Sequence, residues 1–277
     1  MFTLNCKGKL ISADTPLLMG IINATPDSFY RGDLNARLKG ISALAKKMIG
    51  DGADILDIGG QSTRPWSSRI NAAEEISRVI PVIEMIAAEH PGVIISVDTY
   101  SSKVAEAAVH AGASIVNDIS GGHADSDMIP AVAGWNVPYI CMHMKGSPEN
   151  MQQHAQYDDV VKEVLDYFLQ KQQECKNAGI KDMIIDPGFG FAKTAAHNFT
   201  LLKNLSVLKI TGIPLLAGLS RKSTIYKTLD ITPDEALNGT TVLNTLALHN
   251  GADILRVHDV KEAKEVVQLI VNYKSVK

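Results

Sequence analysis

Short runs rich in Ile, Val and Leu alternate along the chain with longer amphipathic segments. This alternation is typical of βα units on a parallel sheet, whose strands are apolar because helices cover both faces. Eight such runs begin near Leu17, Ala53, Val93, Ser114, Pro138, Met183, Pro214 and Ala252. The pattern therefore predicts eight strands, each followed by a helix except where a long loop intervenes.

Local signals place the ends of several other elements. A hairpin is predicted ahead of the first run, with residues 2–5 paired with residues 10–13 across a turn at Gly8, and it would close the bottom of the assembly. Two pairs have the spacing of a capping box and predict helix starts, namely Asn71 with Glu74 and Thr232 with Glu235.

A weak internal repeat favours one closed architecture. Gly-Ala-Asp occurs at Gly52 and Gly251, and Gly-Ala-Ser at Gly112, each opening a predicted strand. An open doubly wound sheet would have fewer strands and usually a GxGxxG turn after the first strand, which is missing after Ile22. We therefore predict one domain over residues 1–277, a (β/α)₈ TIM barrel with a short N-terminal hairpin.

Composition excludes several classes of protein. The chain has 277 residues, 45% of them hydrophobic, and 27 basic and 30 acidic side chains are interspersed to a formal charge of -3. We expect no nucleic-acid partner and no membrane, because there is no basic run and no apolar stretch near the roughly 20 residues of a span. Three cysteines without CxxC spacing indicate neither a disulfide framework nor a zinc site. A cytoplasmic protein is expected.

Most of the apolar runs end abruptly in polar residues. These endings are Asn23, Asp98, Asn117 with Asp118, His143, Asp186, residues 220–222, and Arg256 with His258. In (β/α)₈ barrels the catalytic residues lie at the carboxyl ends of the strands. One face of the domain is therefore expected to collect almost all the chemically useful side chains.

Three of these residues suit recognition of a planar heterocycle. The Asp186 carboxylate offers two acceptors for two adjacent N–H donors, such as those on a 2-amino-4-oxopyrimidine edge. Asn117 can donate and accept at neighbouring ring atoms, and Asp98 could meet another ring N–H. In the alternative interpretation, Asp98 only caps a helix and Asp186 only fixes the turn at Pro187.

A second group suits an anion. Arg256 and His258 are two apart on the last predicted strand, so their side chains point the same way and could grip phosphate oxygens. Arg64 adds a second guanidinium, and Asn23 could place its amide oxygen on a Mg²⁺ that bridges a diphosphate. A surface ion pair at Arg256 and a simple turn at Asn23 are the alternatives.

A third group suits an aromatic co-substrate. Phe29, Pro65 and Phe191 are apolar residues in otherwise polar loops, which favours a sandwich around an aromatic ring. Lys222 could lie beside the heterocycle, while Ser223 could cap the helical turn that follows. The segment around Lys222 could instead be a solvated loop.

These motifs, in this order, make the chain resemble a dihydropteroate synthase from about Leu18 to Asp259. They are residues 19–29 (MGIINATPDSF), 57–65 (DIGGQSTRP), 96–98 (SVD), 117–119 (NDI), 142–144 (MHM), 186–191 (DPGFGF), 220–223 (SRKS) and 256–259 (RVHD). The resemblance implies an enzyme that joins 6-hydroxymethyl-7,8-dihydropterin diphosphate to p-aminobenzoate in folate synthesis, with Mg²⁺. It also implies a homodimer and a target of sulfonamides.

The resemblance assigns a role to each motif residue. Asp98, Asn117, Met142, Asp186, Gly218 and Lys222 would hold the pterin. Asn23, Arg64, Arg256 and His258 would hold the diphosphate and Mg²⁺. Thr63, Pro65, Phe29, Phe191 and Ser223 would border the p-aminobenzoate site. The sequence departs from the commonest pattern at Gln61, Trp66 and Ala192, all toward the second substrate.

The substrate suggests an SN1-like path. Loss of diphosphate leaves a CH₂ cation that the dihydropterin ring stabilises, so catalysis requires leaving-group stabilisation by Arg64, Arg256 and His258. Rival hypotheses are a methyltransferase domain that binds methyltetrahydrofolate, a Schiff-base aldolase that uses Lys222, and a barrel that binds pterin without turnover. The anion grip and the 220–223 motif disfavour the first of these.

Overall fold

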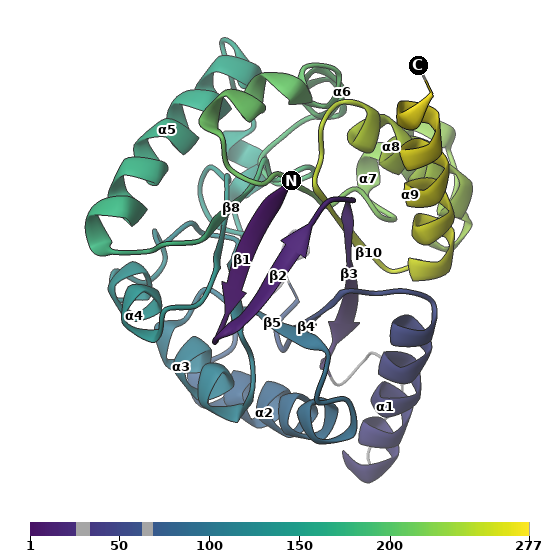
Figure 1. The fold of residues 1–277 in the computed structure, drawn as a ribbon. Coiled ribbons are helices and arrows are strands. Elements are labelled where there is room, and N and C mark those ends of the chain that lie inside the picture. Colours follow the sequence, from purple (N-terminus) through teal and green to yellow (C-terminus); the bar gives the residue numbers. More distant parts are fainter. Residues whose placement is uncertain (26–33, 63–68, 277) are drawn as a thin grey trace.

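The computed structural model describes residues 1–25, 34–62 and 69–276, and these form a barrel of parallel strands surrounded by helices (Figure 1). The strands are β3 (Leu17–Asn23), β4 (Ile55–Gly59), β5 (Ile94–Asp98), β6 (Ile115–Asp118), β7 (Tyr139–Met142), β8 (Met183–Asp186), β9 (Leu216–Ala217) and β10 (Ile254–Val257). Their order in the sheet is β8-β7-β6-β5-β4-β3-β10-β9, and a bridge between Ile185 and Leu215 closes the ring. The predicted (β/α)₈ barrel is confirmed.

Helices follow the strands and form the outer layer. They are α1 (Leu34–Gly50), α2 (Ala72–Glu89), α3 (Ser102–Ala111), α4 (Met128–Trp135), α5 (Val160–Ala178), α6 (Ala195–Lys203), α7 (Ser223–Leu229), α8 (Leu237–His249) and α9 (Val260–Ser275). Short 3₁₀ turns lie at η1 (Met151–His154), η2 (Leu205–Thr211) and η3 (Pro233–Glu235). Within the described ranges, no helix combines the length and the apolar character needed to cross a bilayer.

The predicted hairpin closes one end of the barrel (Figure 1). Strands β1 (Phe2–Cys6) and β2 (Lys9–Ala13) are antiparallel, with Asn5 opposite Leu10. Leu4, Cys6 and Ala13 pack with the residues that fill the barrel interior. The Asn5 amide donates to the Asp182 carboxylate, 3.1 Å away. The hairpin therefore seals the amino-terminal ends of the strands and leaves the opposite end for chemistry.

The two predicted capping pairs have different outcomes. Asn71 caps α2, with its side-chain oxygen accepting from the Glu74 amide at 2.9 Å. Thr232 and Glu235 form a reciprocal capping box, but it belongs to the short turn η3 and α8 begins afterwards at Leu237.

Each strand presents alternate residues to the two sides of the sheet. In β4, Ile55 packs inside the barrel while Leu56 and Ile58 pack against the helices. The same alternation places Ile94, Ile115, Ile140, Ile184, Leu216 and Ile254 in one apolar layer across the barrel interior. The carboxyl ends of the strands lie directly beyond this apolar layer.

Candidate active site

The candidate site is formed by strand residues that face the barrel interior and lie just beyond the apolar layer, toward the carboxyl ends of the strands. Because side chains alternate along a strand, the residue two positions beyond each inward apolar residue also faces inward. These residues are Asp57 on β4, Ser96 and Asp98 on β5, Asn117 on β6, Met142 on β7, Asp186 on β8, Gly218 after β9 and Arg256 on β10. Six of the predicted site residues, Arg256 among them, therefore lie on one mouth of the barrel.

Arg256 is the centre of a buried polar network. Its Nε donates to Asp57 Oδ2 and its Nη2 to Asp98 Oδ2, both at 2.6 Å. Asn117 Nδ2 also donates to Asp57 Oδ2, at 3.0 Å. Burial acts to lower the pKa of Arg256. The negative charges of Asp57 and Asp98 together have the larger effect, so the pKa of Arg256 is raised. Burial raises the pKa of the Asp98 carboxyl, and Arg256 opposes that rise.

Asp57 is a site residue to which the sequence analysis gives no role. Its side chain is fully buried, and it joins Arg256 to Asn117 across three strands. Among the described residues, its second oxygen, Oδ1, has no hydrogen-bond partner. The sequence does contain a signal for Asp57, because it is a carboxylate within the otherwise apolar strand Ile55–Gly59. A buried charge at this position requires a partner inside the barrel.

Asp186 and Lys222 form the opposite side of the mouth. Asp186 Oδ1 accepts from the Gly188 amide at 2.7 Å, and burial raises the pKa of this carboxyl while Lys222 lowers it. Burial lowers the pKa of Lys222 to about 8, and Asp186 opposes that change. The Lys222 ammonium donates to the Phe189 carbonyl and lies 4.7 Å from the centre of the Phe191 ring.

An apolar surface lies beside these charges. Met142, Tyr100 and Ile119 form a small buried cluster, against which Met144 and Phe191 pack. Gly218 has no side chain, and a Cβ at its position would lie 3.7 Å from Lys222 Nζ. Glycine therefore leaves the volume next to Lys222 open. The arrangement combines a flat apolar surface with acceptors and donors at its edge, which suits a planar, polar-edged ring.

The residues predicted to grip an anion lie at the rim. Asn23 ends β3 with an exposed side chain, and His258 follows the end of β10. His258 Nδ1 lies 3.0 Å from Ser220 Oγ. Desolvation, followed by the positive charge of Arg256, lowers the pKa of His258 to about 4. At neutral pH the imidazole is therefore uncharged.

The loop after β9 differs from its prediction in one respect. Ser223 does not cap the following helix: α7 begins at Ser223 itself, and Lys222 occupies the N-cap position without a side-chain cap. The loop is fixed instead by Arg221, whose Nε and Nη2 donate to the two oxygens of Asp259 at 2.9 and 2.8 Å. This bidentate pair ties the β9 loop to the β10 loop and holds Lys222 at the mouth.

Comparison with known proteins agrees with this geometry. Residues 19–258 match the family model described as "Pterin binding enzyme". The chain is 41% identical over 266 residues to the dihydropteroate synthase of Escherichia coli K12, an alignment that covers 95% of this chain and 94% of the relative. The chain belongs to the dihydropteroate synthase family.

Solved structures of family members have the same fold. The dihydropteroate synthase of Xanthomonas albilineans with 4-aminobenzoic acid has a TM-score of 0.93 and 38% identity, over 99% of both chains. The same organism's enzyme in complex with 7,8-dihydropteroate has a TM-score of 0.90 and 36% identity, over all of both chains.

Some predicted site residues lie outside the described part of the chain. These are Phe29, Thr63, Arg64 and Pro65, with Trp66 among the departures from the family pattern. The other two departures are visible. The Gln61 amide nitrogen donates to the Tyr100 hydroxyl, and Ala192 adopts a left-handed backbone with φ 49° and a buried methyl group. Glycine adopts that conformation without the steric cost that alanine incurs.

The residues present fit a Mg²⁺ that arrives with a diphosphate. Within residues 1–25, 34–62 and 69–276, no group of three His, Cys, Asp or Glu side chains could hold a metal ion by itself. Mg²⁺ is usually bound through one or two carboxylates together with substrate phosphates and water. The exposed amide of Asn23 offers one oxygen ligand at the rim, and the phosphates and water would supply the others.

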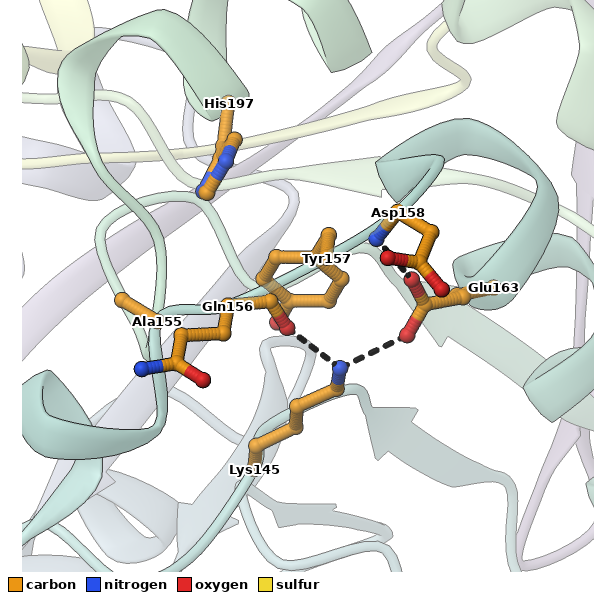
Figure 2. A pocket seen from close by; sticks show the side chains of 7 residues that line it. All are labelled: Lys145, Ala155, Gln156, Tyr157, Asp158, Glu163 and His197. Carbon is orange, nitrogen blue, oxygen red and sulfur yellow. Dashed lines mark hydrogen bonds and ion pairs between the residues drawn. The ribbon is translucent and has the colours of Figure 1, made fainter.

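A separate groove lies on the outer side of the loops that follow β7 and β8. It has a volume of about 440 Å³, and its lining residues are Lys145, Ala155, Gln156, Tyr157, Asp158, Glu163 and His197 (Figure 2). Lys145 Nζ donates to the Gln156 carbonyl at 2.7 Å and pairs with Glu163 at 2.6 Å. None of the seven residues lies on a barrel strand, so this groove is distinct from the mouth.

Proposed function

We propose that the chain condenses 6-hydroxymethyl-7,8-dihydropterin diphosphate with p-aminobenzoate, and releases 7,8-dihydropteroate and diphosphate in folate synthesis. Membership of the dihydropteroate synthase family supports the activity. Family structures carrying 4-aminobenzoic acid and 7,8-dihydropteroate support the substrates. The observation that carries the proposal in this chain is the convergence of Asp98, Asn117 and Asp186 on one apolar surface at the barrel mouth.

The pterin is proposed to lie on Met142 with its polar edge toward the strand ends. Asp186 accepts from adjacent ring N–H groups with the oxygen that Gly188 leaves available, and Lys222 donates to a ring oxygen or nitrogen. Asn117 and Asp98 meet the other edge, each oriented by the network around Arg256. Gly218 leaves room for the ring beside Lys222.

We propose an SN1-like reaction. The bond between the CH₂ carbon and the bridging oxygen breaks, and its electron pair leaves with diphosphate. The p-aminobenzoate nitrogen then donates its lone pair to the cation and releases a proton to water. Asp57, Asp98 and Asp186 place three carboxyl groups at the mouth beside Arg256 and Lys222. In their ionised forms these carboxylates would stabilise a cationic ring.

The leaving group is proposed to bind at the rim. The Nε proton and one Nη2 proton of Arg256 are donated to Asp57 and Asp98, so the two Nη1 protons and the second Nη2 proton remain to meet phosphate oxygens. His258 gains a proton as an anion approaches, and Arg64 completes the grip. Mg²⁺ on Asn23, when bound, would neutralise charge on the departing diphosphate.

The second substrate is proposed to lie outside the pterin, toward Phe191 and Ser223. Phe191 packs at the edge of the apolar cluster, and Ser223 begins α7 at the same mouth. Thr63, Pro65 and Phe29 would complete this site. The nitrogen of p-aminobenzoate would then approach the CH₂ group of the pterin from the side opposite the polar edge of the ring.

We further propose a cytoplasmic homodimer. Exposed apolar side chains support an interface along α6, α7 and α8, namely Phe199, Leu229, Val242 and Leu246. The three cysteines are free and buried, which suits a reducing compartment. Sedimentation equilibrium should give twice the chain mass of 29.9 kDa, and Val242→Glu should shift the protein toward monomers.

A turnover assay tests the proposed activity. The pterin diphosphate, p-aminobenzoate and Mg²⁺ are mixed with the protein, and diphosphate and 7,8-dihydropteroate are measured together. Equal amounts of both products are expected. Pterin binding without turnover would leave only a binding protein, and a borohydride-trapped adduct on Lys222 with a carbonyl substrate would favour an aldolase instead.

A further inference from the structure

Lys193 is a buried lysine held almost entirely by backbone carbonyls. Only 4% of the residue is exposed. Its Nζ lies 3.0 Å from His143 Nδ1, 3.3 Å from the His143 carbonyl, and 3.1 Å from each of the Gly188 and Phe191 carbonyls. An ammonium has three protons, so this site is fully supplied with acceptors.

No carboxylate within the described ranges forms an ion pair with Lys193. Burial lowers the pKa of Lys193 to about 7, and the negative charge of Asp186 opposes that change. Lys193 is a buried ammonium whose partners are mainly backbone carbonyls. Each of these carbonyls must stay in place to compensate for the water that the ammonium has lost. Lys193 therefore holds the backbone that carries them.

The carbonyls that Lys193 fixes belong to the segment that forms the site. We call residues 187–194 the β8 loop. Its Gly188 amide holds the Asp186 carboxylate, and its Phe189 carbonyl accepts from Lys222. Phe191, whose carbonyl binds Lys193, presents its ring 4.7 Å from Lys222 Nζ. Two lysines therefore hold the loop, Lys222 from the mouth and Lys193 from behind.

The back of this arrangement is closed by aromatic rings. The Tyr157 ring centre lies 6.1 Å from that of His143 and 6.0 Å from Lys193 Nζ. On its other side Tyr157 contacts His197 edge-on, with ring centres 5.0 Å apart, and lines the groove in Figure 2. Tyr157 therefore lies next to Lys193 and also lines the groove.

We propose that Lys193 is a positioning residue for the second substrate: through His143 and the β8-loop carbonyls it holds the Phe191 ring against the p-aminobenzoate site. This inference rests on the proposed function, because it assigns Phe191 to that substrate. Lys193 touches no reacting atom. It sets the place of a ring that does contact substrate.

The test compares Lys193→Met with Lys171→Met. Lys171 is a lysine of equal burial, 3% exposed, but it lies on α5 and pairs with Glu174. In Lys193→Met the KM for p-aminobenzoate should rise about tenfold, the effect of about 1.4 kcal/mol of lost binding, while kcat changes less than about threefold. Lys171→Met should leave both constants within about twofold of wild type.

A double-mutant cycle separates positioning from general destabilisation. If Lys193 acts through the Phe191 ring, Lys193→Met should raise KM far less in a Phe191→Ala background than in wild type. Additive effects of the two substitutions would overturn the proposal. Hydrogen exchange of the 188–193 amides should also accelerate at least about tenfold in Lys193→Met, with no such change in Lys171→Met.

A second pair of variants covers the case in which Lys193→Met does not fold. His143→Asn keeps an acceptor near the Nδ1 position, whereas His143→Leu removes it. His143→Leu should raise the p-aminobenzoate KM, and His143→Asn should restore most of the loss; equal effects would overturn the proposal. Absence of turnover in the wild-type protein would sink the proposed function and with it the role of Lys193 toward p-aminobenzoate. Unchanged 188–193 exchange in Lys193→Met, with wild-type turnover intact, would overturn the positioning by Lys193 alone.

Discussion

At the scale of single residues, the site depends on buried charges that have more than one partner. Arg256 would be a costly buried cation alone, and Asp57 would be a costly buried anion. Together with Asp98 and Asn117 they form a network whose members orient one another. Arg256 therefore holds Asp98 and Asp57 in place, and in the proposed function it also binds the anion.

Removing the charge of Asp57 tests this dual role. Asp57→Asn should lower the free energy of unfolding by about 3 kcal/mol, the lower end for a broken buried ion pair, because Arg256 keeps Asp98. Urea unfolding measures the change. The control is Asp166→Asn, whose partner Lys162 is exposed, and the expected change there is below about 0.5 kcal/mol. Similar losses in both variants would mean that the network contributes no special stability.

The pKa values of the two pterin ligands predict the pH range of binding. Lys222 must be protonated to donate, and its pKa of about 8 means that affinity falls as the pH rises through that value. Asp186 must be ionised to accept, and its raised pKa means that affinity falls as the pH drops through it. Calorimetry across pH should show affinity falling on the alkaline side, where Lys222 loses its proton, and on the acid side, where Asp186 gains one.

Lys222→Arg supplies the control for this profile, because an arginine stays charged over the whole range. Its alkaline limb should move to higher pH or vanish, even if affinity at pH 7 is reduced. An unchanged alkaline limb would show that another group, on the protein or the ligand, causes it.

At the scale of elements, strands and their polar endings were predictable because both depend on local sequence. An apolar run long enough for a strand and an abrupt polar residue are visible without partners, and the observed strands begin within two residues of the predicted starts. Asp57 was not assigned because its partners are distant along the chain. Arg256 is 199 residues from Asp57, and only closure of the barrel brings them together. Lys193 was not assigned because His143 is 50 residues away and its nearer partners are backbone carbonyls, which leave no side-chain pattern in the sequence.

The turn after β8 gives a test at this scale. Gly188 has φ 68°, and a Cβ there would lie 2.1 Å from the His143 carbonyl oxygen. Gly188→Ala should therefore displace the β8 loop, loosen Asp186 and lower pterin affinity at least tenfold by calorimetry, a loss of about 1.4 kcal/mol. Gly179→Ala is the control, with φ 96° but no atom within 4 Å of the new Cβ.

The control, Gly179→Ala, introduces the backbone strain of an alanine at positive φ but no clash at the new Cβ. It should lower stability by about 1–2 kcal/mol and leave pterin affinity unchanged. If Gly188→Ala binds pterin as tightly as Gly179→Ala does, the geometry of the β8 loop is not what orients Asp186.

At the scale of the whole molecule, the barrel stacks three layers with different tasks. The β1–β2 hairpin seals one end, a layer of Ile and Leu fills the middle, and the polar mouth stands on that layer. Within the mouth, Asp186 ends β8 and His258 follows β10, so the proposed ring pocket and the proposed anion grip are built from different strands. These two parts are proposed to bind separate portions of one substrate.

Calorimetric titration of the unphosphorylated pterin and of diphosphate with Mg²⁺ into two variants tests that claim most directly. Asp186→Asn should weaken pterin binding at least tenfold, since a charged hydrogen bond worth about 1.5–3 kcal/mol is lost, and should leave diphosphate binding almost unchanged. His258→Ala should do the reverse. If either variant weakens both ligands equally, the mouth is not divided into a ring pocket and an anion grip, and the account is contradicted.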